Sequence, residues 1–165
     1  MKRAALLVSA LAVVLYTVGM SAQATSFAGK WTMDPASAPA PPAGGGGGGG
    51  GRGGRGGGAV SGMEVTITQD ATTLTIAKMQ GQNAVTLKYT LDGKDSKNTT
   101  MGRGGEVVST SQAVMAAGKL TITTTADMGR GPTTTKQVLS IEGGNLMVEN
   151  MGADGTSMGK LTYKK

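Results

Sequence analysis

The chain has 165 residues, with 16 Lys and Arg against 10 Asp and Glu, so its net charge is +6. It contains no Cys and no His, which excludes disulfide and thiolate chemistry and removes the commonest general base and transition-metal ligand. From this composition we expect no catalytic residues, no metal site and no cofactor, and therefore a protein that is not an enzyme.

The first 24 residues have the features of a secretory signal peptide. Lys2 and Arg3 precede an apolar run over residues 4–19, and the small residues of the stretch 22–24 form a cleavage pattern. The apolar run is shorter than the roughly 20 residues that span a bilayer. We expect cleavage near Ala24, a secreted or periplasmic protein, and no transmembrane segment in the mature chain.

A tract rich in Pro, Gly and Arg divides the mature chain into unequal parts. Residues 25–40 hold the first expected strand, residues 41–59 form the tract, and residues 60–165 form a region long enough for one small domain. Polyglycine buries no apolar surface, so we expect the tract to be a disordered tether.

Two arginines in the tract, Arg52 and Arg55, suggest an RGG-type arm for nucleic acid. Arms of this kind use many repeats and aromatic side chains on which bases stack, whereas the tract has two Arg and no aromatic. Residues 51–56 also match the dinucleotide pattern G-x-G-x-x-G, but that site needs a strand before the loop and a helix after it. We expect neither nucleic acid nor a dinucleotide as a partner.

Apolar and polar residues alternate with a period of two along most of the remaining chain. In the stretch 84–91, for example, Val85, Leu87 and Tyr89 share one face, and two threonines and a lysine share the other. This pattern is typical of antiparallel strands with one buried face. We expect strands near residues 27–33, 62–69, 73–79, 84–91, 96–101, 105–115, 119–127, 133–141, 145–151 and 157–164.

About eight to ten such strands form an all-β, antiparallel, up-and-down meander. We expect this meander to close into a barrel because closure removes the exposed sheet edges, and a β-sandwich is the alternative. The stretches 92–95, 117–119 and 142–145 are short and rich in residues that accept positive φ, which predicts tight hairpins.

A second class of turn carries a Met followed closely by Gly. These turns start at Met79, Met101, Met128 and Met151, with spacings of 22, 27 and 23 residues, about one hairpin each. Alternate connections of a meander lie at the same end, so we expect Arg103 and Arg130, which stand in two of these turns, to form a basic rim there. Such a rim would attract an anionic ligand or anionic lipid.

Two further patterns concern acidic residues and a modification sequon. Glu64, Glu106 and Glu149 are the carboxylates that a hydrolase would have to pair, but the sequence gives no sign of a pair, and each reads as an outward strand residue. Asn98 begins the sequon Asn-Thr-Thr, which is a glycosylation acceptor in a host that modifies such sites.

The sequence resembles the lipocalins and related calycin barrels, and in particular small secreted lipocalin-like proteins of bacteria whose function is uncharacterised. The resemblance is carried by Gly29-x-Trp31 on the first strand, and by the stretches FAGKWTMDPAS, VTITQDATTLTI, YTLDGKDSKNTT, GKLTITTT and VLSIEGGNLMVE. It covers nearly all of the mature chain except the glycine tract. It implies a barrel whose Trp closes one end.

The resemblance also implies a small apolar or amphipathic ligand in the barrel interior. On this reading Trp31, Tyr89 and Met115 are the candidate contacts. The alternative is a filled barrel that acts as an envelope or surface protein, with contacts made by its outer face and by the Gly/Arg tract. A carrier needs an interior cavity of several hundred Å³, whereas a surface protein needs a packed interior and an exposed patch. The sequence leaves the oligomeric state open.

Overall fold

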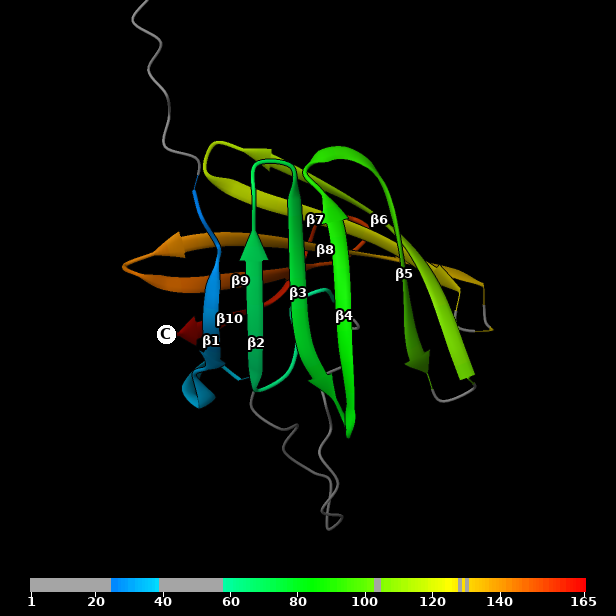
Figure 1. Ribbon diagram of the computed structural model, residues 1–165, viewed down its shortest axis with the longest axis horizontal. Coiled ribbons are helices and arrows are strands. Elements are labelled where there is room, and N and C mark those ends of the chain that lie inside the picture. Colours follow the sequence, from blue (N-terminus) through cyan, green and yellow to red (C-terminus); the bar gives the residue numbers. More distant parts are fainter. Residues whose placement is uncertain (1–24, 39–57, 103–104, 128, 130) are drawn as a thin grey trace, which may run out of the picture.

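A computed structural model describes residues 25–38, 58–102, 105–127, 129 and 131–165 (Figure 1). In these ranges the chain forms ten antiparallel β-strands and one short 3-10 helix. The elements are β1 (Gly29–Met33), η1 (Pro35–Ser37), β2 (Glu64–Gln69), β3 (Thr73–Gln80), β4 (Asn83–Thr90), β5 (Asp92–Gly102), β6 (Gly105–Ala116), β7 (Lys119–Asp127), β8 (Pro132–Glu142), β9 (Asn145–Met151) and β10 (Ser157–Lys164).

The strands form one sheet in the order β4-β3-β2-β1-β10-β9-β8-β7-β6-β5, which confirms the predicted all-β, up-and-down barrel. Strands β1 to β4 cross in front of β7 to β10, so that the sheet wraps around its own interior (Figure 1). The ends of the chain meet where β1 pairs with β10, with Thr32 opposite Lys164 and Met33 opposite Tyr163. The strand that carries Trp31 therefore completes the barrel wall.

The barrel remains open between β4 and β5, which follow each other in the chain but share no ladder of backbone hydrogen bonds. Side chains of β5 bridge this seam instead. The amide of Asn98 accepts from the Lys88 N–H (2.7 Å) and donates to the Lys88 carbonyl (3.0 Å). The Ser96 hydroxyl accepts from the Thr90 N–H (3.0 Å). The barrel is thus nearly closed.

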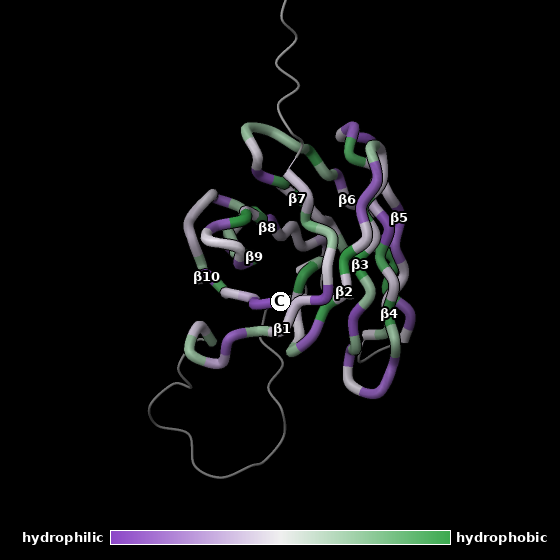
Figure 2. Tube along the Cα trace, turned by 60° about the vertical axis from the view of Figure 1, so that its left-hand side comes forward, coloured by the Kyte–Doolittle hydropathy of each residue, from purple (hydrophilic) through white to green (hydrophobic). Residues whose placement is uncertain are grey.

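Alternation of residue type along each strand produces the core (Figure 2). Every second side chain points inward, so the apolar set of each strand meets the others in one cluster. The largest fully buried side chains are Trp31, Tyr89, Tyr163 and Phe27. Four aromatic side chains in so small a barrel leave little interior volume unfilled, because each buries a large apolar area.

Two of the three predicted tight hairpins are confirmed. Ala117 and Gly118 have φ of 48° and 75°, and Gly143 and Gly144 have φ of 57° and 81°, the left-handed pair that a two-residue hairpin requires. The prediction for residues 92–95 is wrong, because β5 already begins at Asp92. The register against β6 is irregular between Asp92 and Asp95, so this stretch is a bulged strand rather than a turn.

The two strands that flank the tract are neighbours in the sheet. Thr32 of β1 lies opposite Glu64 of β2, and the Met33 N–H donates to the Met63 carbonyl (2.7 Å). The two ends of the connection over residues 34–62 therefore lie side by side. It is a long insertion in a β-hairpin, and its length is not required to close the sheet.

We expect deletion of residues 44–52, which removes roughly half of the connection between Ala38 and Gly58, to raise the free energy of unfolding slightly, by about 0.6 kcal/mol. A shorter loop loses less conformational entropy when its ends are brought together. Urea unfolding of the mature protein and the deletion variant measures the difference. A loss of more than about 2 kcal/mol would contradict this account, because it would mean that the deleted residues make stabilising contacts.

Candidate functional site

The three side chains predicted to contact a ligand all point into the barrel. Trp31 and Tyr89 are buried members of the core cluster, and Met115 packs against it from β6. The Trp31 indole Nε1–H donates to the Phe27 carbonyl at 2.9 Å, which satisfies its only polar group. Burial raises the pKa of the Tyr89 hydroxyl, so this side chain stays neutral. Trp31, Tyr89 and Met115 therefore all contribute to the same apolar core.

Two depressions among the described residues lie on the surface of the barrel. The first has a volume of about 200 Å³ and is lined by Thr72, Thr73, Leu91 and their neighbours, at the turns that lead into β3 and β5. The second, of about 180 Å³, lies beside it along β2 and β3. Both are smaller than the pockets of about 300–1,000 Å³ that hold small-molecule ligands.

A layer of polar side chains crosses the interior below the apolar core. We call it the polar layer; it consists of Lys78, Asn98, Ser111, Thr124, Gln137 and Asn150. Each stands at an inward position of its strand, where period-two alternation continues past the apolar residues. In β3, for example, Lys78 follows Leu74 and Ile76 on the inner face. The sequence analysis missed this layer, although the alternation contains its signal.

The end of the glycine tract enters this layer. Gly58, Ala59 and Val60 are buried, although the first two were assigned to the tract. The Gln137 amide accepts from the Val60 N–H (2.9 Å) and donates to the Val60 carbonyl (3.0 Å) and to Asn150 Oδ1 (2.7 Å). We call residues 58–61 the inserted segment, because they fill interior space that wall side chains leave empty.

Lys78 holds the same segment from the opposite side. Its ammonium donates to the carbonyls of Gly58 (2.9 Å) and Ala59 (3.0 Å) and to the Ser61 hydroxyl (2.9 Å). All three acceptors are neutral, and no carboxylate of the described residues forms an ion pair with Lys78. Burial without an opposite charge lowers the pKa of Lys78 to about 8.

This depressed pKa predicts that stability rises with pH. The usual lysine pKa of 10.5 applies in the unfolded chain, so between pH 8 and 10.5 the unfolded state binds more protons than the folded state. The free energy of unfolding should therefore rise as the pH increases through this window. Urea unfolding between pH 7 and 9.5 measures the slope, which should be flatter in Lys78→Met than in the wild type.

The upper limit of pH 9.5 keeps the measurement below the pH at which the tyrosines ionise. Burial raises the pKa of Tyr163 to about 12, so tyrosine ionisation in the unfolded chain near pH 10 lowers stability and would mask the effect. The matched control is Lys88→Met, which removes an exposed lysine of β4. Equal slopes in Lys78→Met and Lys88→Met would contradict the assignment to Lys78.

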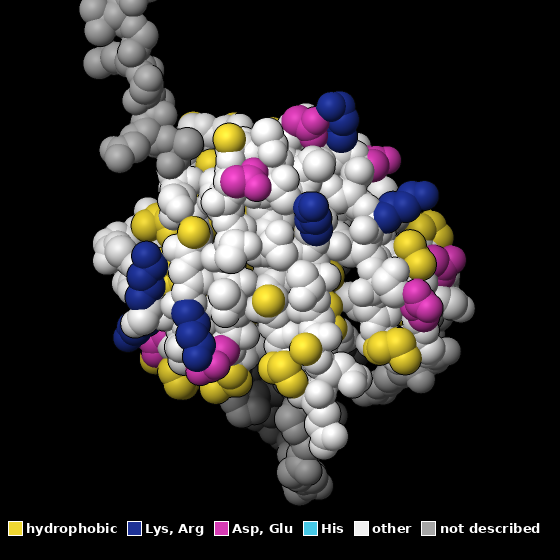
Figure 3. Space-filling view, in the orientation of Figure 1, with side chains coloured by type: hydrophobic (Ala, Val, Ile, Leu, Met, Phe, Trp, Pro, Cys, Tyr) yellow, Lys and Arg dark blue, Asp and Glu magenta, His cyan; other side chains and the backbone are white. Residues whose placement is uncertain are grey.

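Alternate connections of the meander lie at one end of the barrel, as expected; they are β3–β4, β5–β6, β7–β8 and β9–β10. Methionines gather there, and we call this end the methionine end. Its exposed members are Met63, Met79, Met101 and Met158, each more than half exposed at 60%, 57%, 55% and 70%. Figure 3 shows hydrophobic side chains along the lower edge of the molecule, where β2, β3 and β5 begin or end.

The two turns in which we expect the basic rim connect strands at the same end. Gly102 and Gly105 bound one of its turns, and Asp127 and Pro132 bound another, so the sequence places Arg103 and Arg130 in these connections. Both arginines themselves lie outside the described residues. The tract also leaves β1 and rejoins β2 at this end.

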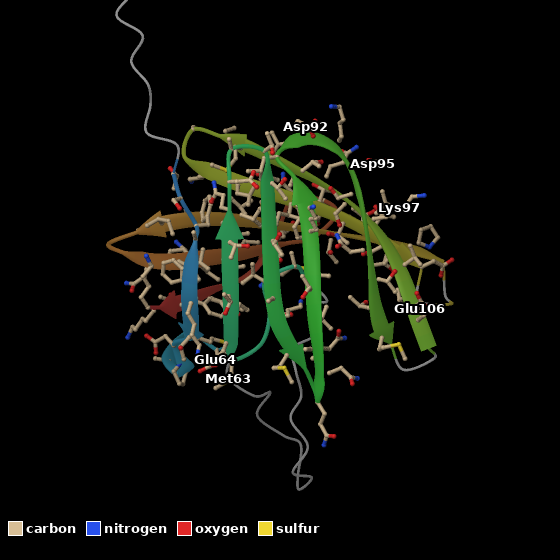
Figure 4. All side chains as sticks on the ribbon, in the orientation of Figure 1. Met63, Glu64, Asp92, Asp95, Lys97 and Glu106 are labelled. Carbon is tan, nitrogen blue, oxygen red and sulfur yellow. The ribbon has the colours of Figure 1, made fainter. Side chains whose placement is uncertain are left out.

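Glu64, Glu106 and Glu149 stand on β2, β6 and β9, three strands that are not neighbours in the sheet. Glu64 stands at the start of β2 and Glu106 at the start of β6, on different sides of the view in Figure 4. Asp92 and Asp95 lie at the start of β5, near the top of the same view. No group of three or more acidic side chains in the described ranges is arranged to hold a metal ion.

The Asn98 amide is engaged across the seam, so its sequon is not accessible in the folded barrel.

Comparison with protein-family models finds no match, and comparison with curated proteins finds none either. No helix in the described part of the chain has the length and apolar character that a membrane span needs. The nearly closed all-β barrel is compatible with a lipocalin-like fold. The class of protein is thus defined by its architecture: a small, nearly closed up-and-down barrel with a buried apolar core.

Proposed function

We propose that the protein is an exported, non-enzymatic, lipocalin-like barrel that acts through its outer surface, with the methionine end as the contact region. The packed interior carries this proposal, because buried aromatic and aliphatic side chains and the inserted segment occupy the space that a carrier would leave for a ligand. The signal-peptide pattern of residues 1–24 supports export.

The chemistry of the methionine end fits an anionic lipid surface. Four exposed methionines provide flexible apolar contacts, and the sequence adds Arg103 and Arg130 in the adjoining turns and Arg52 and Arg55 in the tract. Each arginine near an anionic membrane contributes about 1 kcal/mol of attraction. Apolar contact and charge together favour adsorption at the head-group level.

Sedimentation with lipid vesicles tests this function. We expect the mature protein to bind vesicles of phosphatidylcholine that contain phosphatidylglycerol, and to bind more weakly at high salt because charge attraction is screened. Substitution of Met63, Met79, Met101 and Met158 by Gln should reduce binding at least tenfold. The control is Val114→Gln, which changes an exposed apolar residue near the end of β6 that lies away from the methionine end. Absence of binding, or equal losses in both variants, would overturn the proposal.

A carrier of a small amphipathic ligand is the second candidate function. One observation favours it: part of the interior is filled by a chain segment and not by side chains of the wall. Native mass spectrometry of protein recovered from an exporting host without delipidation tests this candidate. A reproducible added mass that disappears in Trp31→Ala or Tyr89→Ala would support it, and a bare mature mass after challenge with a lipid mixture would count against it.

A further inference from the structure

We infer that the inserted segment, residues 58–61, is a displaceable internal ligand, and that the site beneath it, formed by Lys78 and Gln137, binds the carboxylate of a small amphipathic molecule. The inference deepens the second candidate function and does not depend on the methionine end.

The hydrogen bonds of the segment are those of a bound ligand. Gln137 pairs with both backbone groups of Val60 across 77 residues of sequence, and all three donors of the Lys78 ammonium are directed at the segment. Apart from the Ser61 hydroxyl, the segment contributes only main-chain atoms to these contacts. The site therefore recognises carbonyl oxygens and does not depend on particular side chains of its occupant.

The occupant does not match the charge of the site. A partly buried ammonium is held by two carbonyls and a hydroxyl, with no opposite charge among its hydrogen-bond partners. Hydrogen bonds between two charged groups are roughly twice as strong as those between neutral groups. A carboxylate in place of the Gly58 and Ala59 carbonyls would give Lys78 the counter-ion that it lacks, and the Gln137 amide would donate to the same anion.

The space also has an apolar side. Ala59 and Val60 belong to the hydrophobic core cluster, with exposed fractions of 3% and 0%. A ligand that replaces them must combine a carboxylate with a short apolar tail. Gly62, at φ 103°, lies between the segment and β2, and supplies the backbone freedom that the segment needs to move out.

The fit of the segment is strict at one position. A Cβ at Gly58 would collide with the side-chain amide of Gln137. Substitution by Ala therefore forces either the segment or the Gln137 amide to shift, which weakens the seating of the segment without changing the identity of any wall residue. Because the segment is tethered, it competes with a free ligand at an effective concentration in the millimolar range. Weakening it should raise the apparent affinity of the site for a carboxylate.

Calorimetric titration of the full mature chain with hexanoate, and with hexanol as the uncharged probe of equal length, tests the inference. We expect hexanoate to bind Gly58→Ala at least tenfold more tightly than hexanol at pH 7, because a hydrogen bond to a charged group contributes about 1.5–3 kcal/mol. This preference should disappear in the double variant Gly58→Ala with Lys78→Met. It should persist in Gly58→Ala with Lys88→Met, which removes an exposed lysine from the neighbouring strand.

Amide hydrogen exchange in the wild-type protein provides a readout that needs no variant. The Val60 N–H is buried and bonded to Gln137, so it should be protected in the free protein and exchange faster as hexanoate is added. A Val60 amide that stays protected at saturating hexanoate would overturn the inference, as would a lack of hexanoate binding to Gly58→Ala. Neither result would affect the vesicle experiment, so failure of this site and failure of the proposed surface function are distinguishable.

Discussion

Replacement of Trp31 by Ala should lower the free energy of unfolding by about 3–5 kcal/mol, the largest effect that we expect from a single substitution. The side chain is 1% exposed, and it lies in the strand that joins β2 to β10 and so closes the barrel. Truncation leaves a large cavity and deprives the Phe27 carbonyl of its indole donor. Small domains have a total stability of about 5–15 kcal/mol, so the variant should be close to unfolding at room temperature.

Urea unfolding followed by far-ultraviolet circular dichroism measures this loss without relying on tryptophan fluorescence. Trp31→Phe is the informative companion, because it keeps an aromatic ring and removes the indole donor, and it should cost about 1–2 kcal/mol. Met158→Ala, at a side chain that is 70% exposed, should change stability by less than about 0.5 kcal/mol. A loss below about 1 kcal/mol for Trp31→Ala would show that the first strand is not part of the barrel wall.

Replacement of Gln137 by Leu should cost about 2–4 kcal/mol. Leu fills the interior with an apolar group, but it leaves the Val60 N–H and carbonyl without partners, at about 1–3 kcal/mol for each buried polar group. If the inserted segment moves out and these groups are hydrated, the loss is limited to the free energy with which the segment docks. In that case the Val60 amide should lose its protection from hydrogen exchange, while the backbone amides of β8 remain protected.

The matched control for this substitution is Gln112→Leu. Gln112 is exposed on β6 and its amide donates to Asp95 at 2.9 Å, so its removal should cost less than about 0.5 kcal/mol. Urea unfolding of both variants separates the role of the buried amide from a general effect of Gln to Leu substitution in a strand. Equal costs at the two positions would contradict the role assigned to Gln137.

Stability and ligand binding are coupled at the inserted segment. The same contacts from Lys78 and Gln137 stabilise the closed barrel and occupy the site that we assign to a carboxylate. A ligand that displaces the segment gives up part of this docking free energy, which sets the affinity that a free molecule can reach. Gly58→Ala should therefore lower stability and raise hexanoate affinity together, a pair of effects that simple destabilisation of the barrel does not produce.

The sequence by itself determined the strands and most of their boundaries. Period-two alternation is a local property, because adjacent side chains point to opposite faces of any sheet, so runs such as Val85, Leu87 and Tyr89 identify strands without knowledge of their partners. The two hairpins at residues 117–118 and 143–144 are local as well, since Gly118, Gly143 and Gly144 adopt positive φ without the steric cost of a Cβ. At Asp92 the same residue types accommodate a bulge, and composition alone does not distinguish the two.

Only the tertiary structure decided where the barrel remains open, how its interior is filled and which groups are hydrogen-bonded to the residues of the polar layer. Each depends on residues distant in the chain: Asn98 bridges β4 and β5 by replacing a backbone ladder, and Gln137 binds Val60 across 77 residues. Alternation places Lys78 on the inner face, but it does not reveal that carbonyls of the glycine tract are its partners. Hydrogen bonds of this kind form only after the strands have assembled and brought the groups together, so no local pattern encodes them.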